Sequence, residues 1–92
     1  MDLFTIFIEK RAHKSLQDIE LKIRNKIDEC IKKLETNPWP AKEYNLSKIE
    51  GMEDCFRIRI GRYRIGYKVD NDKREITVFI IDKKSETTYK RR

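Results

Sequence analysis

The amino-acid sequence predicts an α+β fold: an N-terminal strand, a two-helix hairpin, and then an antiparallel sheet of three consecutive strands with the helices packed on one face. Three patterns carry this prediction. Apolar residues follow a helical spacing over residues 16–34, apolar and basic residues alternate strictly over residues 55–69, and residues 76–81 are almost all apolar. A chain of 92 residues has room for one core, so residues 1–92 are expected to form a single domain.

The first strand and the helix pair occupy the N-terminal part of the chain. Residues 2–8 are β-branched and aromatic and end at a charged run, which predicts a strand. The helical stripe that follows consists of Leu16, Ile19, Ile23, Ile27, Cys30, Ile31 and Leu34. Leu21 lies about 140° from that stripe, so we expect a break near residues 19–21, with a short helix before a longer one. The longer helix should end before Asn37-Pro38, because a residue that precedes proline is pushed out of helical geometry.

An irregular segment is expected from Pro38 to about Asp54. Its one tryptophan, Trp39, is interpreted as a lid over the core, because a large aromatic side chain with a polar edge suits that position. Stacking on a nucleic-acid base is the alternative role.

A hairpin is predicted over residues 55–69, because a two-residue turn with glycine first, here Gly61-Arg62, is a favoured connection. The implied register places Arg59 opposite Arg64. One face then carries the apolar side chains Phe56, Ile58, Ile60, Tyr63, Ile65 and Tyr67, and the other carries Arg57, Arg59, Arg64 and Lys68. After a turn at residues 70–72, residues 76–81 are predicted to form a third strand that is covered on both faces.

The composition excludes several classes of protein. The longest apolar stretches are a few residues long, so no membrane span is expected, and the N-terminus lacks the basic start and apolar core of a signal peptide. Cys30, Cys55 and His13 are too few ligands for a zinc site, and both thiols are expected to be reduced and structural in a cytoplasmic protein. Three glycines leave no room for a glycine-rich phosphate loop.

The distribution of charge points to a polyanion partner. The formal net charge is +6, and residues 54–68 and 83–92 each carry five basic side chains against one acidic side chain. Solvated basic surfaces that keep the protein soluble are the alternative.

Like charges directly opposed in a hairpin are destabilising, and here Arg59 faces Arg64 with Arg57 beside them. Gly66, opposite Arg57, leaves the sheet locally bare, as if another group approaches closely. An anion, and phosphate above all, would compensate such a face, because the guanidinium donates hydrogen bonds in pairs and stays charged. The alternative is neutralisation by an acidic residue such as Glu50 or Glu53.

A larger pattern surrounds this hairpin. A leucine, a short gap and a glycine precede an aromatic–basic–apolar–basic strand; then come glycine, one residue and Tyr-Arg, a hydrophobic strand, and a terminal basic cluster that ends in tyrosine. The residues concerned are Leu46, Gly51, Phe56-Arg57-Ile58-Arg59, Gly61-Arg62-Tyr63-Arg64, Val78–Ile81, Lys83-Lys84 and Tyr89. This pattern resembles that of the RelE/ParE toxin superfamily. The first strand, the helix pair and Pro38 match as well, so the resemblance covers nearly the whole chain.

The resemblance implies a toxin of a toxin–antitoxin pair that cleaves mRNA in the ribosomal A site without a metal or cofactor. Its partners would be a small acidic RelB-like antitoxin, the ribosome and mRNA. The positions that match functional residues of the family, and so are expected to be catalytic, are Arg57, Arg59, Arg64, Lys83 (or Lys84) and Tyr89. The basic residues expected to bind substrate beside them are Arg62, Lys68 and Lys84.

Two departures from RelE bear on the chemistry. RelE carries lysines where this sequence has Arg57 and Arg59, and arginine does not readily deprotonate. The general base would then be Tyr89, Lys68 or a terminal lysine, or charge stabilisation would dominate. Lysine also replaces the usual terminal arginine and loses its bidentate geometry.

Two other functions stay open from the sequence. The first is a ParE-like toxin that inhibits DNA gyrase and cleaves nothing. The second is a basic RNA- or ribosome-binding module without catalysis. The basic second strand and the terminal tyrosine favour the nuclease.

Overall fold

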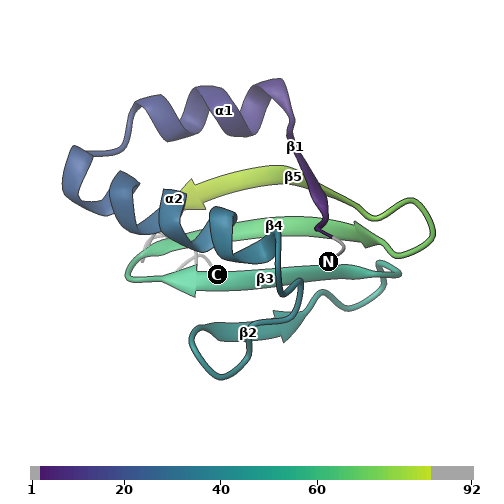
Figure 1. The fold of residues 1–92 in the computed structure, drawn as a ribbon. Helices are drawn as coiled ribbons and strands as arrows, with labels where there is room; N and C mark the ends of the chain where they lie inside the picture. The colour runs from purple at the N-terminus through teal and green to yellow at the C-terminus, as the bar shows by residue number, and fades with distance from the viewer. Residues whose placement is uncertain (1–2, 84–92) are drawn as a thin grey trace.

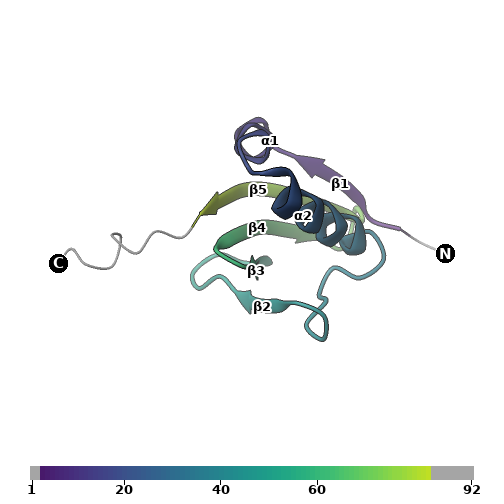
Figure 2. The ribbon, with the colours of Figure 1, turned by 90° about the vertical axis from the view of Figure 1, so that its left-hand side faces the viewer.

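The computed structural model describes residues 3–83 as two helices and five strands, and the predicted α+β class is confirmed. In chain order the elements are β1 (Thr5–Ile8), α1 (Lys10–Gln17), α2 (Leu21–Leu34), β2 (Asn45–Lys48), β3 (Cys55–Ile60), β4 (Tyr63–Asp70) and β5 (Glu75–Lys83). Both helices lie on one side of the sheet, with α2 crossing in front of β4 (Figures 1 and 2). No helix in the described part of the chain is long and apolar enough to cross a membrane.

The five strands form one mixed sheet in the order β1-β5-β4-β3-β2. The three consecutive strands β3, β4 and β5 are antiparallel, as predicted. β1 pairs in parallel with β5, since the helix pair returns the chain to the other end of the sheet before the hairpin begins. β5 is therefore an inner strand of the sheet, with β1 on one side and β4 on the other.

The interpretation of residues 38–54 as wholly irregular is wrong, because β2 lies within this segment. Asn45–Lys48 has little strand propensity of its own, since three of its four residues are polar, and the alternation of Tyr44 and Leu46 with Asn45 and Ser47 is only four residues long. The four residues become a strand by pairing with the otherwise open edge of β3. The strand β2 therefore depends on tertiary pairing with β3 and not on the propensity of its own residues.

The predicted helix break is confirmed between α1 and α2. The amide of Ile19 donates to the carbonyl of Leu16, and the Ile19 side chain stays buried in the core although it lies outside both helices. The helices pack on the sheet mainly through Ala12, Leu16, Ile27, Cys30, Ile31 and Leu34. Burial raises the pKa of the Cys30 thiol to about 12, so this cysteine is a neutral core residue at physiological pH.

The hairpin register is the predicted one, with Ile60 opposite Tyr63 across Gly61-Arg62. Gly61 has a φ of 59°, a conformation that glycine adopts without a Cβ penalty. Arg62 keeps a negative φ, as expected of a type II′ turn with glycine first. The apolar hairpin face is the one that meets the helices, and Ile58, Ile65 and Tyr67 are fully buried there.

β5 departs from the prediction of a strand covered on both faces. Ile76, Val78 and Ile81 are buried beneath the helices, but Phe79 and Ile80 lie half-buried on the side without helices. The register shifts at this point, since Gly66 faces Ile80 while Tyr67 faces Val78. The resulting β-bulge turns two consecutive apolar side chains toward the same face.

Tyr67 ties the sheet to the segment that follows α2. Its hydroxyl donates a buried hydrogen bond of 2.6 Å to the carbonyl of Pro38. The ring of Phe56 lies 5.9 Å from the Tyr67 ring, and Trp39 meets Phe56 edge-on at 6.4 Å. Trp39 is 40% exposed and meets Phe56 at the edge of the core, and its role as a lid stays a prediction.

We expect Tyr67→Phe to lower the free energy of unfolding by about 1–3 kcal/mol, because it leaves the buried Pro38 carbonyl without its donor. Urea denaturation measures the loss. Tyr63→Phe is the matched control, since the Tyr63 ring is only half-buried and its hydroxyl has no hydrogen-bond partner within residues 3–83. Equal effects of the two substitutions would contradict the assignment.

Candidate functional site

The side of the sheet opposite the helices, here called the open face, carries the predicted basic residues. Strand alternation brings Arg57 and Arg59 of β3 and Arg64 and Lys68 of β4 to this face, and Arg59 lies directly opposite Arg64. The predicted separation of the hairpin into an apolar and a basic side is therefore confirmed. Arg57, Arg59 and Arg64 form one group at the end of the face near the hairpin turn, which we call the arginine cluster.

Arg57 and Arg59 are exposed and have no acidic partner among residues 3–83. Neither guanidinium lies within 4.0 Å of a carboxylate in the described part of the chain. Their cross-strand neighbours on β2 are small and neutral, because Ser47 pairs with Arg57 and Asn45 with Arg59. These four residues line a pocket of about 260 Å³ that opens on the solvent. Two adjacent cations are thus held with their donors available to an anion.

Arg64, in contrast, is paired. Its Nε donates to Oδ1 of Asp82 at 3.2 Å and its Nη2 to Oδ2 at 3.1 Å, in a bidentate arrangement between β4 and β5. The alternative of neutralisation by an acidic residue is correct for this arginine, but the partner is Asp82 and not Glu50 or Glu53. Asp82 lies opposite Arg64 in the register of β5, a strand whose alignment the hairpin pattern does not fix. The pair orients the guanidinium and leaves Nη1 to donate elsewhere.

The expectation that another group approaches Gly66 closely is confirmed, but that group is part of the chain and not an anion. A Cβ atom at Gly66 would lie 2.6 Å from Cγ2 of Ile80 and 3.2 Å from the ring of Phe79. The group that approaches the bare backbone is therefore the bulge of β5, packed over the glycine from within the same face. Gly66 is required for close packing of the chain on itself.

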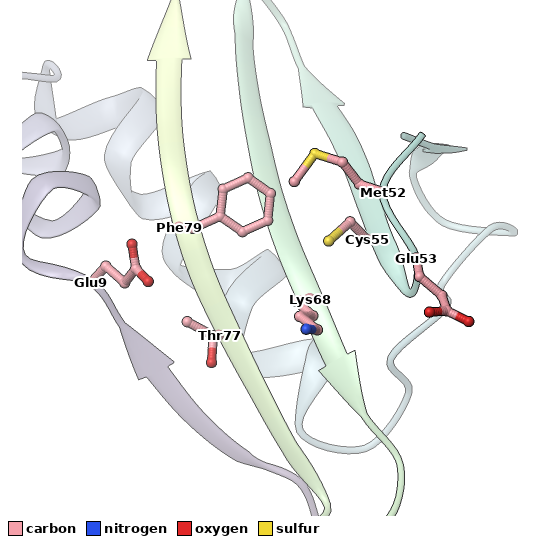
Figure 3. Close-up of a pocket in the computed structure, with 7 residues that line it drawn as sticks. All are labelled: Glu9, Met52, Glu53, Cys55, Lys68, Thr77 and Phe79. Atoms are coloured by element: carbon pink, nitrogen blue, oxygen red, sulfur yellow. The ribbon is translucent and has the colours of Figure 1, made fainter. Parts of the chain in front are cut away.

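Lys68 lies at the other end of the open face, opposite Cys55. Lys68 is four positions along β4 from Arg64, roughly 13 Å. Figure 3 shows Lys68 in a groove of about 490 Å³ whose other lining residues are Glu9, Met52, Glu53, Cys55, Thr77 and Phe79. The structure does not bring Lys68 together with the arginine cluster, and its surroundings combine both signs of charge with apolar side chains.

The remaining predicted site residues are spread over three places. Arg62 is exposed in the hairpin turn, next to the arginine cluster. Lys83 ends β5 opposite Tyr63, so alternation sends its side chain to the helix-bearing face rather than the open face. Lys84 and Tyr89 lie outside the described residues, and their roles stay predictions.

The cysteines and the acidic residues do not form a metal site in the part of the chain that is described. No three His, Cys, Asp or Glu side chains gather there closely enough to hold an ion. Cys55 is buried under the loop before β3, and this burial raises its pKa, an effect that the nearby Lys68 partly offsets. Both thiols are free.

Sequence reasoning missed three residues on the open face. Asp82 lies between the predicted strand 76–81 and the basic segment 83–92, and its position directly after the buried Ile81 indicates that its side chain lies on the opposite face. Asn45 and Ser47 could not be found, because they reach the face only through the unpredicted strand β2.

Both the sequence and the fold of this chain match those of known toxins. The chain matches, over residues 6–87, the family described as ParE toxin of the type II toxin–antitoxin system, parDE. It is 34% identical over 87 residues to a protein of Methanocaldococcus jannaschii assigned as toxin RelE1, a match that covers 95% of this chain and 96% of the relative. The chain therefore belongs to the RelE/ParE superfamily of toxins of toxin–antitoxin systems.

Solved structures agree with this membership. The toxin in the archaeal RelE-RelB complex from Pyrococcus horikoshii matches with a TM-score of 0.81 at 26% identity, over 90% of this chain and 97% of that chain. The RelB-RelE antitoxin–toxin complex from Methanococcus jannaschii gives a TM-score of 0.71 at 26% identity, over 84% of this chain and 88% of that chain. The intact E. coli RelBE complex, at 22% identity and a TM-score of 0.75 over 90% and 98% of the chains, shares the fold.

A double-mutant cycle on Arg64→Ala and Asp82→Ala should give a coupling free energy of about 1 kcal/mol, the upper part of the range for partly exposed pairs, because the contact is bidentate. Urea denaturation at low and high salt measures it, and the coupling should fall at high salt. The matched cycle on Arg59→Ala and Asp82→Ala should give a coupling near zero, since β4 lies between these residues. Similar couplings in the two cycles would contradict the pairing.

Proposed function

We propose that this protein is a single-domain toxin that cleaves mRNA in the A site of the translating ribosome and so inhibits translation. The observation that carries the proposal is the pair Arg57 and Arg59, exposed and without a carboxylate partner among residues 3–83, beside an Arg64 already oriented by Asp82. A protein gains no stability from opposed arginines. It gains a site in which unneutralised cations meet a phosphodiester.

Besides these residue types, the reaction needs a proton acceptor for the 2′-hydroxyl and a proton donor for the departing O5′. The 2′-hydroxyl oxygen attacks the adjacent phosphorus in line, a bond from O2′ to phosphorus forms, and the bond from phosphorus to O5′ breaks. The proton of the 2′-hydroxyl goes to a base, and the departing O5′ takes up a proton, which leaves a 2′,3′-cyclic phosphate and a 5′-hydroxyl. Charge builds on the equatorial phosphoryl oxygens, where preorganised guanidinium groups stabilise it.

The arginines divide this work according to their surroundings. Arg57 and Arg59 are free to follow the substrate, because no side chain in the described part of the chain holds them. Arg64 has its Nε and Nη2 bound to Asp82, so it presents a fixed Nη1 edge. Such a fixed donor loses little conformational entropy when phosphate binds.

The general base is proposed to be Tyr89. Arginine does not give up its proton near neutral pH, and Lys68 lies roughly 13 Å from Arg64 along β4. Tyr89 is the position that the family pattern assigns to a functional tyrosine, and Lys83 or Lys84 would supply the terminal cation.

The partner proposed for this toxin is a small acidic antitoxin in the same cytoplasm. This proposal is supported by two similar solved structures, which are complexes of RelE with RelB from Pyrococcus horikoshii and Methanococcus jannaschii. The basic end of the open face and the basic residues 83–92 suit an acidic chain that folds as it binds.

Inhibition of DNA gyrase is the second candidate function, because the matching family model is named for ParE. The arginines of β3 favour cleavage of RNA instead, since a purely steric inhibitor has no use for unneutralised cations on a hairpin. Arrest of replication with translation intact would favour the gyrase-directed function.

Arg57→Ala and Arg59→Ala should each raise the activation free energy of single-turnover mRNA cleavage on programmed ribosomes by about 2–4 kcal/mol, because each removes a cation that stabilises the charge on the phosphoryl oxygens. Both side chains are exposed, so melting temperatures should stay near the wild-type value. Arg11→Ala, an equally exposed arginine on α1, is the control and should cleave normally. Wild-type rates in both β3 variants, with the fold intact, would refute this active site.

Tyr89→Phe and Tyr89→Ala separate two roles of the terminal tyrosine. If the hydroxyl accepts the proton, both variants should lose most of the cleavage rate, because phenylalanine keeps the ring but not the hydroxyl. If the ring only stacks on a base, Tyr89→Ala should lose about 1–3 kcal/mol and Tyr89→Phe nothing. The same single-turnover assay decides between the two outcomes, and a normal rate in Tyr89→Phe would rule out the proposed base.

A further inference from the structure

The β2 pocket, lined by Asn45, Ser47, Arg57 and Arg59, is chemically different from the rest of the open face. On its β3 side stand two cations, and on its β2 side stand an amide and a hydroxyl. Asn45 and Ser47 are exposed, and their side chains have no hydrogen-bond partner within residues 3–83. β2 is also an edge strand, at the lower margin of the sheet in Figure 1, so nothing in the sheet lies beyond it.

This combination of groups matches the parts of a ribonucleotide. Guanidinium groups bind phosphate with paired hydrogen bonds. An amide and a hydroxyl each donate and accept, so they can bind a ribose hydroxyl, which is also both donor and acceptor. A carboxylate ligand would use the two arginines and leave the acceptor oxygens of Asn45 and Ser47 without a donor.

The position of the pocket relative to the arginine cluster fixes which nucleotide could enter it. Across the open face the order is Asp82, Arg64, Arg59 and Asn45, on four adjacent strands. Neighbouring strands are about 4.8 Å apart, so Asn45 lies about 10 Å from the Arg64 strand. A phosphate held between Arg59 and Arg64 therefore places the adjoining nucleotide of the same RNA strand over β2.

We propose that the β2 pocket is a ribonucleotide subsite, in which Arg57 and Arg59 hold a phosphate while Asn45 and Ser47 hydrogen-bond the 2′-hydroxyl of the nucleotide next to the one that reacts. The assignment rests on the proposed function for the location of the reacting phosphate. Asn45 and Ser47 are binding residues here and take no part in the proton transfers. They make the face prefer RNA over DNA, a preference that arginines alone do not confer.

The first test is binding without the ribosome. A short single-stranded RNA and the DNA of the same sequence are titrated against wild type, Asn45→Ala, Ser47→Ala and the control Lys48→Ala, which alters the neighbouring β2 residue on the opposite face. The two pocket variants should bind the RNA about three- to tenfold more weakly, the worth of one hydrogen bond, and the DNA as well as wild type does. Their salt dependence should equal that of wild type, because no cation is lost, whereas Arg57→Ala should lower the slope.

The second test is cleavage on programmed ribosomes. Asn45→Ala and Ser47→Ala should raise KM and leave kcat near the wild-type value, because the contact is made equally in the ground and transition states. A structural role alone would lower the melting temperature and affect RNA and DNA alike, which circular dichroism and the DNA titration detect.

The outcomes separate the two proposals. Loss of RNA preference in the pocket variants supports the subsite, even if the wild-type protein does not cleave mRNA and the proposed function fails. Normal cleavage by wild type with RNA binding, KM and RNA preference unchanged in both variants overturns the subsite alone. Equal loss of RNA and DNA binding, or weaker binding of the antitoxin with unchanged RNA binding, also overturns it.

Discussion

The register of the β3–β4 hairpin is the constraint on which the rest of the structure depends. The glycine-first turn sets Ile60 against Tyr63, and from that pair the alternation carries Ile58, Ile65 and Tyr67 into the core. A slip of one residue would exchange the faces, burying arginines beneath α2 and exposing the core of the sheet. The hydrophobic face therefore places the site, because the same alternation that buries the isoleucines holds the arginines outward.

On the open face, one of the opposed arginines is neutralised while the guanidinium groups of the others stay available to an anion. Asp82 neutralises Arg64 from the neighbouring strand and leaves Arg57 and Arg59 without a carboxylate within the described residues. The asymmetry yields one oriented cation and two unneutralised ones. A second aspartate opposite the β3 arginines would stabilise the sheet and remove their attraction for phosphate. β2 supplies neutral side chains at that place, so the repulsion between the arginines is retained.

The two ends of the open face differ in chemistry because of the bulge in β5. At the turn end the sheet is regular and its side chains are cationic and polar. Toward the other end, Phe79 and Ile80 pack over Gly66 and form an apolar partition, beyond which Lys68, Glu9 and Glu53 surround a separate groove. The arginine side chains are thereby gathered at the turn end, and the groove beyond the partition combines charged and apolar side chains.

Local periodicity by itself determined much of this protein: the helix break, the hairpin register, the apolar and basic faces, and the direction of Arg57, Arg59 and Arg64. These features depend on residues close together in the chain, whose spacing is visible in the sequence. Only the tertiary structure decided that residues 45–48 form a strand, that Asp82 and not Glu50 or Glu53 meets Arg64, and that Phe79 and Ile80 fill the space over Gly66. Each of these features depends on the alignment of two segments across the sheet. The free energy that selects this alignment comes from burial of the whole core, so it cannot be inferred from the residues of one short segment.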